Sequence, residues 1–125
     1  MGHYSVLDIG TIYVTIAKVE ILEYLDWNGR SPYAEWFDSL SAPAAAKVAV
    51  GITRLAQGNF SNVKGVGGGV YEYRVNFGPG FLIYLGKDGE RLVILLAGGT
   101  KKRQQNDIED ARARWQDYKK RKIRE

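Results

Sequence analysis

The sequence predicts a single α+β domain in which helices pack on one antiparallel sheet. Three observations support this prediction: an alternating segment near the N-terminus, two short stretches with apolar residues at helical spacing, and a run of β-prone segments separated by turn residues. At 125 residues the chain is most simply one compact domain with a substantial core. We assign this domain to residues 18–125 and treat residues 1–17 as an N-terminal extension or extra strand.

The first predicted elements are a strand and two helices. Residues 18–25 alternate loosely between apolar and charged side chains, as a strand does. Ser31-Pro32 then supplies an N-cap and a proline at the first helical position, before apolar residues at helical spacing. Ser41 begins a second helical pattern that stops near Gly58. The short connection between the two patterns predicts an antiparallel helical hairpin.

A meander of three antiparallel strands is predicted from Val70 to Lys102, after a flexible glycine-rich connector at 59–69. Gly78-Pro79-Gly80 is typical of a three-residue hairpin loop, and Asp88-Gly89 of a two-residue type I′ turn. The registers that follow pair Phe77 with Phe81, Arg74 with Tyr84, Lys87 with Glu90 and Leu85 with Leu92. We expect the meander to complete a four-stranded sheet with the first strand.

Alternation along these strands divides the meander into two faces. One face is apolar and suited to packing against helices; it collects Tyr71, Tyr73, Val75, Phe77, Phe81, Ile83, Leu85, Leu92, Ile94 and Leu96. The other face is mixed and collects Glu72, Arg74, Asn76, Leu82, Tyr84, Arg91, Val93 and Leu95. Because charged side chains need a reason to lie on an otherwise apolar sheet, we expect chemistry or binding on this second face.

Positive charge is concentrated at the C-terminal end, where residues 107–122 predict a basic helix. Residues 101–125 hold ten Lys or Arg and five acids, a balance of +5, whereas residues 1–100 hold the other eight cations and nine acids, a balance of −1. This asymmetry fits an anionic partner, either nucleic acid or an acidic protein surface. A solvated helical tail that helps solubility accounts for it equally well.

The composition excludes several kinds of site. The chain has no cysteine, so disulfides and thiolate metal sites are ruled out, and its one histidine, His3, lies next to the terminus. We therefore expect no metal site at His3. The longest apolar run, 92–97, is far shorter than the roughly 20 residues that span a bilayer. No secretory signal is evident at the N-terminus, and we expect a cytoplasmic protein without a membrane partner.

A series of short segments resembles a known family in both order and spacing. These segments are Trp36-Phe37, Gly69-Val70-Tyr71-Glu72-Tyr73-Arg74-Val75, Gly78-Pro79-Gly80-Phe81, Leu92-Val93-Ile94-Leu95-Leu96, Gly98-Gly99-Thr100-Lys101, and Asp107-Ile108-Glu109 with Ala111. Over roughly residues 18–120 the chain resembles the RelE/ParE toxin superfamily of bacterial type II toxin–antitoxin modules, in particular its HigB-like, phage-associated branch.

This resemblance implies an endoribonuclease that cuts messenger RNA in the ribosomal decoding site, without a metal or cofactor. The ribose 2′-oxygen would attack the adjacent phosphate and leave a cyclic phosphate. Such a reaction needs a group that accepts the 2′ proton, cations that stabilise the phosphorane charge, and a proton for the leaving oxygen. The implied partners are the ribosome with its mRNA and a helix-turn-helix antitoxin. The toxin would contact operator DNA only through this antitoxin.

The resemblance also implies roles for particular residues. Glu72 and Arg74 fall where family members place base and phosphate-binding groups, and Lys101 and Lys102 fall where a cation lies near the scissile phosphate. Tyr84, expected beside Arg74, would stack on a base or orient a phosphate. The candidate catalytic residues are thus Glu72, Arg74, Lys101, Lys102 and Tyr84. The candidate RNA-binding residues, which would position phosphates, are Lys64, Lys87, Arg91 and Arg103.

One position departs from the family pattern and keeps two alternatives open. Family members usually carry an arginine at the position of Leu82, and Arg91 is the cation on the same predicted face that would replace it. Leu82 favours a DNA gyrase inhibitor of the ParE type, whereas Arg74 and the lysines favour an RNase. The other alternative is a catalytically inactive module that binds RNA or an acidic antitoxin.

Overall fold

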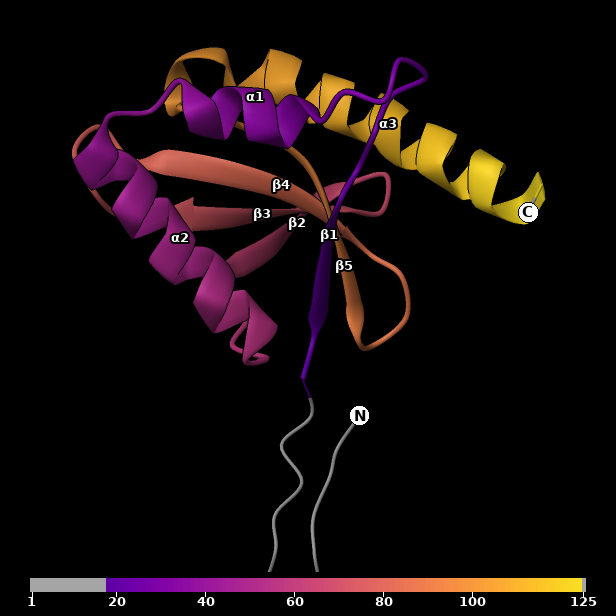
Figure 1. Ribbon diagram of the computed structural model, residues 1–125, viewed down its shortest axis with the longest axis horizontal. Helices are drawn as coiled ribbons and strands as arrows, with labels where there is room; N and C mark the ends of the chain where they lie inside the picture. Colours follow the sequence, from indigo (N-terminus) through magenta and orange to yellow (C-terminus); the bar gives the residue numbers. More distant parts are fainter. Residues whose placement is uncertain (1–17, 125) are drawn as a thin grey trace, which may run out of the picture.

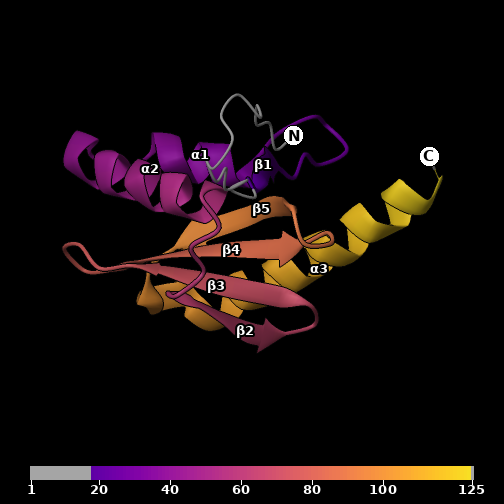
Figure 2. The same ribbon diagram turned by 90° about the horizontal axis from the view of Figure 1, so that it is seen from below.

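The computed structural model describes residues 18–124, so the expected extension or extra strand at 1–17 lies outside the described residues. The described chain is α+β, as predicted, with two short helices on one face of a mixed sheet and a long C-terminal helix on the other (Figure 1, Figure 2). Its elements are β1 (Glu20–Glu23), α1 (Pro32–Asp38), α2 (Ala42–Ala56), β2 (Val63–Gly67), β3 (Val70–Val75), β4 (Phe81–Lys87), β5 (Leu92–Gly99), the short 3₁₀ helix η1 (Lys101–Arg103) and α3 (Gln104–Arg124). The strand order across the sheet is β1-β5-β4-β3-β2.

The sheet has one parallel pair, because β1 lies alongside β5 in the same direction while the other strands are antiparallel.

The two predicted helix starts are confirmed. Ser31 Oγ accepts a hydrogen bond from the Ala34 amide at 3.0 Å, and Ser41 Oγ accepts one from the Ala44 amide at 3.3 Å. Each serine thereby satisfies one of the free amides of a first helical turn.

The predicted antiparallel packing of α1 against α2 was wrong. The two helices diverge from the corner at Ser39–Ser41, so that α1 lies over β5 while α2 contacts β1 and β3 (Figure 1). With only 7 residues, α1 is too short to present a continuous ridge to α2. Each helix instead buries its own apolar side on the sheet.

The predictions of a flexible connector at 59–69 and of a four-stranded sheet were wrong, because this segment contributes β2 as a fifth strand. β2 pairs with β3, with Lys64 directly opposite Glu72. Two valines explain why a glycine-rich segment forms a strand: Val63 packs against one core cluster and Val66 against the other. The glycines at 67–69 have positive φ and form the turn into β3.

The predicted register of the β3–β4 hairpin was wrong by two residues. Phe81 pairs with Val75 rather than with Phe77, and Arg74 pairs with Leu82 rather than with Tyr84. The loop is longer than predicted, with a turn closed by the Gly80 amide donating to the Phe77 carbonyl at 2.9 Å. A shift of two residues preserves the side of the sheet on which each side chain lies, so the predicted faces of β3 and β4 are correct.

The predicted β4–β5 register was wrong by three residues from Leu85 onward and by four at Tyr84, and the odd shift reverses the faces of the first part of β5. Leu85 pairs with Leu95 rather than with Leu92, because the loop spans residues 88–91 instead of a two-residue turn and the ladder is irregular between Tyr84 and Leu85. Leu95 therefore belongs to the cluster under α1 and α2, whereas Ile94 belongs to the cluster under α3. These assignments reverse the predicted ones.

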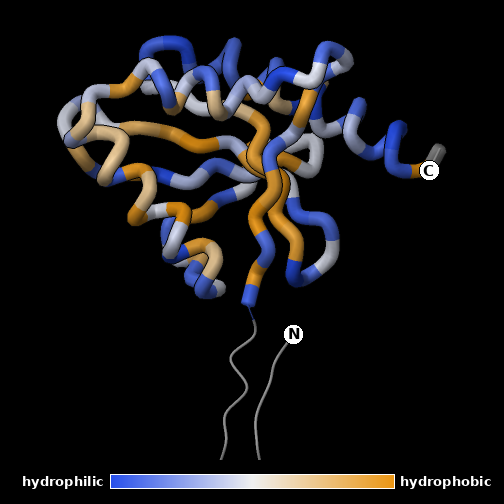
Figure 3. The backbone as a smooth tube through the Cα atoms, in the orientation of Figure 1, coloured by the Kyte–Doolittle hydropathy of each residue, from blue (hydrophilic) through white to orange (hydrophobic). Residues whose placement is uncertain are grey.

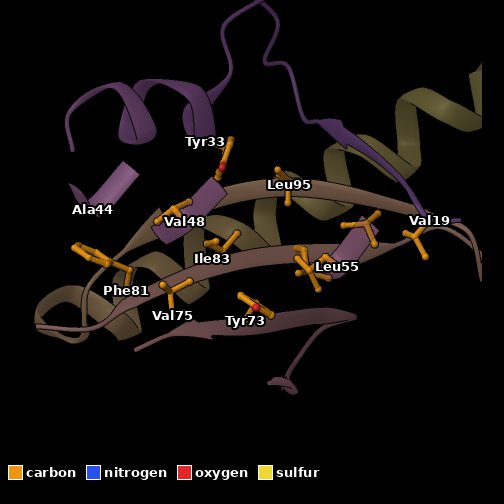
Figure 4. Close-up of a cluster of buried hydrophobic side chains, with 12 residues drawn as sticks. Val19, Tyr33, Ala44, Val48, Leu55, Tyr73, Val75, Phe81, Ile83 and Leu95 are labelled. Carbon is orange, nitrogen blue, oxygen red and sulfur yellow. The ribbon is translucent and has the colours of Figure 1, made fainter. Parts of the chain in front are cut away.

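Two apolar clusters lie on opposite sides of the sheet, and the hydrophobic stretches of the chain follow its central strands (Figure 3). The first lies under α1 and α2 and includes Val48, Leu55, Tyr73, Ile83 and Leu95 (Figure 4). The second lies under α3 and includes Leu82, Tyr84, Ile94, Ala111 and Trp115. The face on which we expected chemistry is therefore largely covered by α3.

The predicted basic helix begins earlier and ends later than expected, and it is fastened to the rest of the domain along its second half. Tyr24 donates a hydrogen bond to Asp117 Oδ2 at 2.6 Å, and Lys122 Nζ lies 2.6 Å from Asp88 Oδ1. These contacts tie α3 to the segment after β1 and to the β4–β5 loop. No helix among residues 18–124 has the length and apolar character needed to span a membrane.

Candidate active site

Two adjoining hollows lie at the end of the sheet where β3 enters the loop to β4, on the face that α3 covers elsewhere. The first hollow has a volume of about 290 Å³ and is lined by the loop residues 77–80, by Phe81 and Leu82, and by Lys101. The second hollow has a volume of about 400 Å³ and is lined by residues 61–64 and Glu72. Arg74 and Asn76 line both hollows and form their common wall.

Three cations from three different elements converge on these hollows. Arg74 comes from β3, Lys64 from β2 and Lys101 from η1, and all three side chains are exposed. Arg74 lies between the other two, because Lys64 lines only the second hollow and Lys101 only the first. Guanidinium and ammonium groups so placed suit an extended phosphodiester, with one phosphate at the common wall.

Strand pairing explains how residues distant in the sequence reach this site. On β3, alternation directs Glu72 and Arg74 to the same face, and the register places Lys64 opposite Glu72. At the other side, Leu82 pairs with Gly99 at the end of β5, so that η1 begins beside the β3–β4 loop. The extended Thr100 then turns the chain into η1 and brings Lys101 to the first hollow.

Glu72 forms part of the lining of the second hollow, although only 1% of the residue is exposed. The Gln104 side chain, in the first turn of α3, donates a hydrogen bond from Nε2 to Glu72 Oε2 at 2.9 Å. The other carboxylate oxygen, Oε1, has no hydrogen-bond partner among residues 18–124. Buried carboxylate oxygens are normally paired, so an orphaned one beside a hollow is a candidate proton acceptor.

Tyr84 lies opposite Glu72 rather than beside Arg74, and its side chain is fully buried beneath α3. Its hydroxyl has no partner within the described part of the chain. Burial, together with the negative charges of Glu72 and Asp107, raises the pKa of the Tyr84 phenol far above its ordinary value of 10. Tyr84 is thus a neutral phenol behind the site and does not line either hollow.

The remaining candidates line neither hollow. Lys102 and Arg103 follow Lys101 in η1 and are exposed. Lys87 and Arg91 flank the β4–β5 loop, at the opposite end of β4 from the hollows. The Lys87 ammonium lies 4.7 Å from the Phe60 ring centroid and 4.5 Å from that of Tyr71, which occupies it in cation–π contacts.

Sequence reasoning did not select three residues that the fold brings to the site: Asn62, Asn76 and Gln104. Alternation had put Asn76 on the correct face, but nothing marked it as a site residue. Asn62 lay in a segment that we took for a connector, and only the pairing of β2 with β3 reveals its position. Gln104 lay before the predicted start of the last helix.

No group of three or more His, Asp or Glu residues within 18–124 is arranged to hold a metal ion. The polar side chains that line the hollows supply cations, amides, one hydroxyl and one carboxylate. These groups suit recognition of a phosphodiester and proton transfer from a hydroxyl beside it.

Asp107, in the first turn of α3, gives the domain a testable pH dependence. Burial is the main reason that the pKa of its carboxyl is raised above the ordinary value of 3.8, with Asp110 adding to the effect and Arg103 and Arg114 opposing it. The folded chain therefore retains a proton that the unfolded chain has released, so the contribution of Asp107 to stability falls as pH rises above 3.8.

We expect Asp107→Asn, which keeps the shape of the side chain against Gly99, to gain stability relative to the wild-type chain as pH rises from about 4 to 7. Urea unfolding of both proteins across this range measures the difference in unfolding free energy. A constant difference between the two proteins would show that this carboxyl ionises normally in the folded state.

Comparison with known proteins identifies a relative of this chain. An uncharacterized protein of Haemophilus influenzae (strain ATCC 51907 / DSM 11121 / KW20 / Rd) is 40% identical over 81 residues, which cover 64% of this chain and 82% of that protein. No protein-family model matches the sequence.

Proposed function

We propose that this chain, which belongs to the same family as the Haemophilus influenzae protein, is the toxin of a type II toxin–antitoxin module and cleaves mRNA on the ribosome without a metal. The observation that carries the proposal is the position of Arg74 in the common wall of two hollows, with Lys64 on one side and Lys101 on the other. An RNA strand that crosses this wall places one phosphate at Arg74 and a nucleotide in each hollow.

The proposed reaction is a transesterification followed by release of the two RNA ends. The ribose 2′-oxygen forms a bond to the adjacent phosphorus while the bond from phosphorus to the 5′-oxygen breaks, which leaves a 2′,3′-cyclic phosphate and a 5′-hydroxyl. Arg74 neutralises the charge that grows on the phosphorane oxygens, since a cation fixed where charge develops favours the transition state. Glu72 accepts the 2′ proton, and Lys101 supplies a proton to the leaving 5′-oxygen.

Gln104 supports this assignment by fixing the carboxylate that would act as base. Its hydrogen bond to Glu72 Oε2 holds one oxygen and leaves Oε1 for the 2′-hydroxyl. Glu72 is 1% exposed and its Oε1 atom is buried, so its position relative to α3 decides whether it can act as the base. We take Gln104 to be a positioning residue.

The departure at Leu82 is consistent with this arrangement. Leu82 is 1% exposed and belongs to the cluster under α3, where an arginine would place a charge among apolar side chains. Lys101 lines the same hollow and supplies a positive charge there in place of the missing arginine. Arg91, which we had considered as the replacement, lies beyond the far end of β4.

The partners follow from the same proposal. The ribosome would present the mRNA in its decoding site, and a helix-turn-helix antitoxin would hold the toxin inactive and connect it to operator DNA. Inducible expression of the chain without an antitoxin in bacteria tests the activity. We expect growth arrest and new mRNA ends in phase with codons, carrying 5′-hydroxyls. Growth arrest with intact transcripts would contradict the proposal.

A second candidate function is inhibition of DNA gyrase, which the apolar residue at position 82 favours. This function predicts DNA breaks and an SOS response on expression, without RNA cleavage. Measuring both responses in the same cultures separates the two candidates.

A further inference from the structure

The two hollows differ in chemistry, although they share a wall. The first hollow contains apolar side chains, those of Phe77, Pro79 and Phe81, beside the backbone of the glycine loop. Side chains that hydrogen-bond supply most of the lining of the second, where Ser61 and Asn62 lie beside Lys64. An aromatic or aliphatic lining accepts any base by contact, whereas amides and hydroxyls distinguish bases by their edges.

Asn62 is the side chain of the second hollow that is best placed to recognise a base. Its carbonyl accepts a hydrogen bond from the Arg74 amide at 3.3 Å, so the two residues lie opposite each other just beyond the β2–β3 ladder. Asn62 is exposed, and its side-chain amide has no hydrogen-bond partner among residues 18–124. A free donor and acceptor therefore lie next to the cation that we assign to the phosphate.

The segment that carries Asn62 is fixed before β2 begins. Asn59 Oδ1 accepts hydrogen bonds from the Ser61 amide at 3.0 Å and from the Ser61 hydroxyl at 2.8 Å. The Val63 amide donates to the Phe60 carbonyl at 3.0 Å, which closes the turn into the strand. A backbone held in this way loses little conformational freedom on binding, which favours discrimination between ligands.

We propose that the second hollow is the base-recognition subsite of this RNase and that Asn62 determines its preference. This inference rests on the proposed function. The Asn62 amide pairs with a base edge on which a donor lies next to an acceptor, while the first hollow holds the nucleotide on the other side of the cut without distinguishing its base. Sequence preference is then confined to one of the two positions that flank the cleaved bond.

Sequencing of the 5′ ends of cellular transcripts, after expression of each variant, tests this proposal. The wild-type chain should show a base preference at one flanking position. Asn62→Ala should weaken that preference by about tenfold, the effect of one bidentate contact. Asn62→Asp offers two acceptors and should shift the preference toward guanine, whose Watson–Crick edge carries two neighbouring donors. Pro79→Ala, in the first hollow, should keep the wild-type preference whatever its total cleavage.

The possible outcomes separate this inference from the function on which it rests. Cleavage by the wild-type chain with an unchanged base preference in both Asn62 variants would overturn the inference alone. Absence of cleavage by the wild-type chain would overturn the proposed function and the inference together. Because Asn62 is exposed, its variants should unfold at the wild-type urea concentration, which excludes misfolding as the cause of a changed preference.

Discussion

Replacing Arg74 by alanine is expected to reduce mRNA cleavage by about 10²–10³-fold, the usual loss when one group that stabilises developing charge is removed. Arg74 carries a positive charge and lines both hollows, whereas Lys64 lines only the second hollow and Lys101 only the first. The side chain is exposed and forms no ion pair among the described residues, so its loss should leave the fold intact. The expected defect is therefore in the reaction and not in folding.

Arg91→Ala is the matched control for this experiment. Arg91 is also an exposed arginine beside the sheet, but it lies next to the β4–β5 loop, at the opposite end of β4 from the hollows. Its loss removes the same charge and should leave the rate of cleavage nearly unchanged. Arg74→Lys keeps the charge but not the planar fork of donors. Its rate of cleavage should lie between those of Arg74→Ala and Arg91→Ala.

Growth after induction and quantitative mapping of 5′ ends provide the measurements. Cleavage by Arg74→Ala at the wild-type rate would show that Arg74 has no role in the reaction. Unchanged growth inhibition by Arg74→Ala, with transcripts intact, would favour the catalytically inactive module that binds RNA or an acidic antitoxin. If toxicity disappears while the variant still co-purifies with the antitoxin, the module explanation fails and the catalytic proposal stands.

Local sequence signals predicted the elements of this fold better than their pairing. Ser31 and Ser41 marked both helix starts correctly because a cap depends on residues within one turn. The register of β5 depends instead on loop length, and Asp88-Gly89 suggested a two-residue turn where the chain uses residues 88–91. One odd shift in register was then enough to reverse the faces of the first part of β5.

The part of the candidate site that lies on a single strand could also be predicted from local sequence. Alternation on β3 put Glu72 and Arg74 on one face, which needs no knowledge of the neighbouring strands. Alternation does not reveal what covers a face, and so it did not show that α3 buries Tyr84 while leaving Arg74 exposed. Asn62 remained hidden because Val63 and Val66 form a strand only when two cores are available to receive them.

The largest effect on stability is expected from Gly86→Ala. Gly86 lies in β4 beneath α3, and a Cβ atom there would come 2.3 Å from Cε3 of the Trp115 ring. The ring cannot easily move away, because it stacks on Tyr118 with centroids 5.2 Å apart and its Nε1 already lies close to Gly69. The methyl group must therefore displace the indole, and with it α3, or push β4 out of the sheet.

Two opposing terms decide the size of this effect. Gly→Ala restricts the unfolded chain and by itself stabilises by about 0.4–1 kcal/mol. Overpacking typically costs about 1–3 kcal/mol and more where neither neighbour can shift, so we expect a net loss of about 2 kcal/mol. Gly65→Ala is the control, since its Cβ would meet nothing closer than 3.9 Å. Urea unfolding should show a lower midpoint for Gly86→Ala alone.

A double variant shows whether Trp115 is the cause. Trp115→Leu alone should be destabilising, because it empties part of the cluster under α3. In the presence of Trp115→Leu, however, the methyl group of Gly86→Ala has space. The double variant should therefore lose less unfolding free energy than the sum of the two single losses, by about 1 kcal/mol or more. Strictly additive losses would mean that α3 does not press its indole against β4. The position of Gln104 beside Glu72, which depends on the same helix, would then need another explanation.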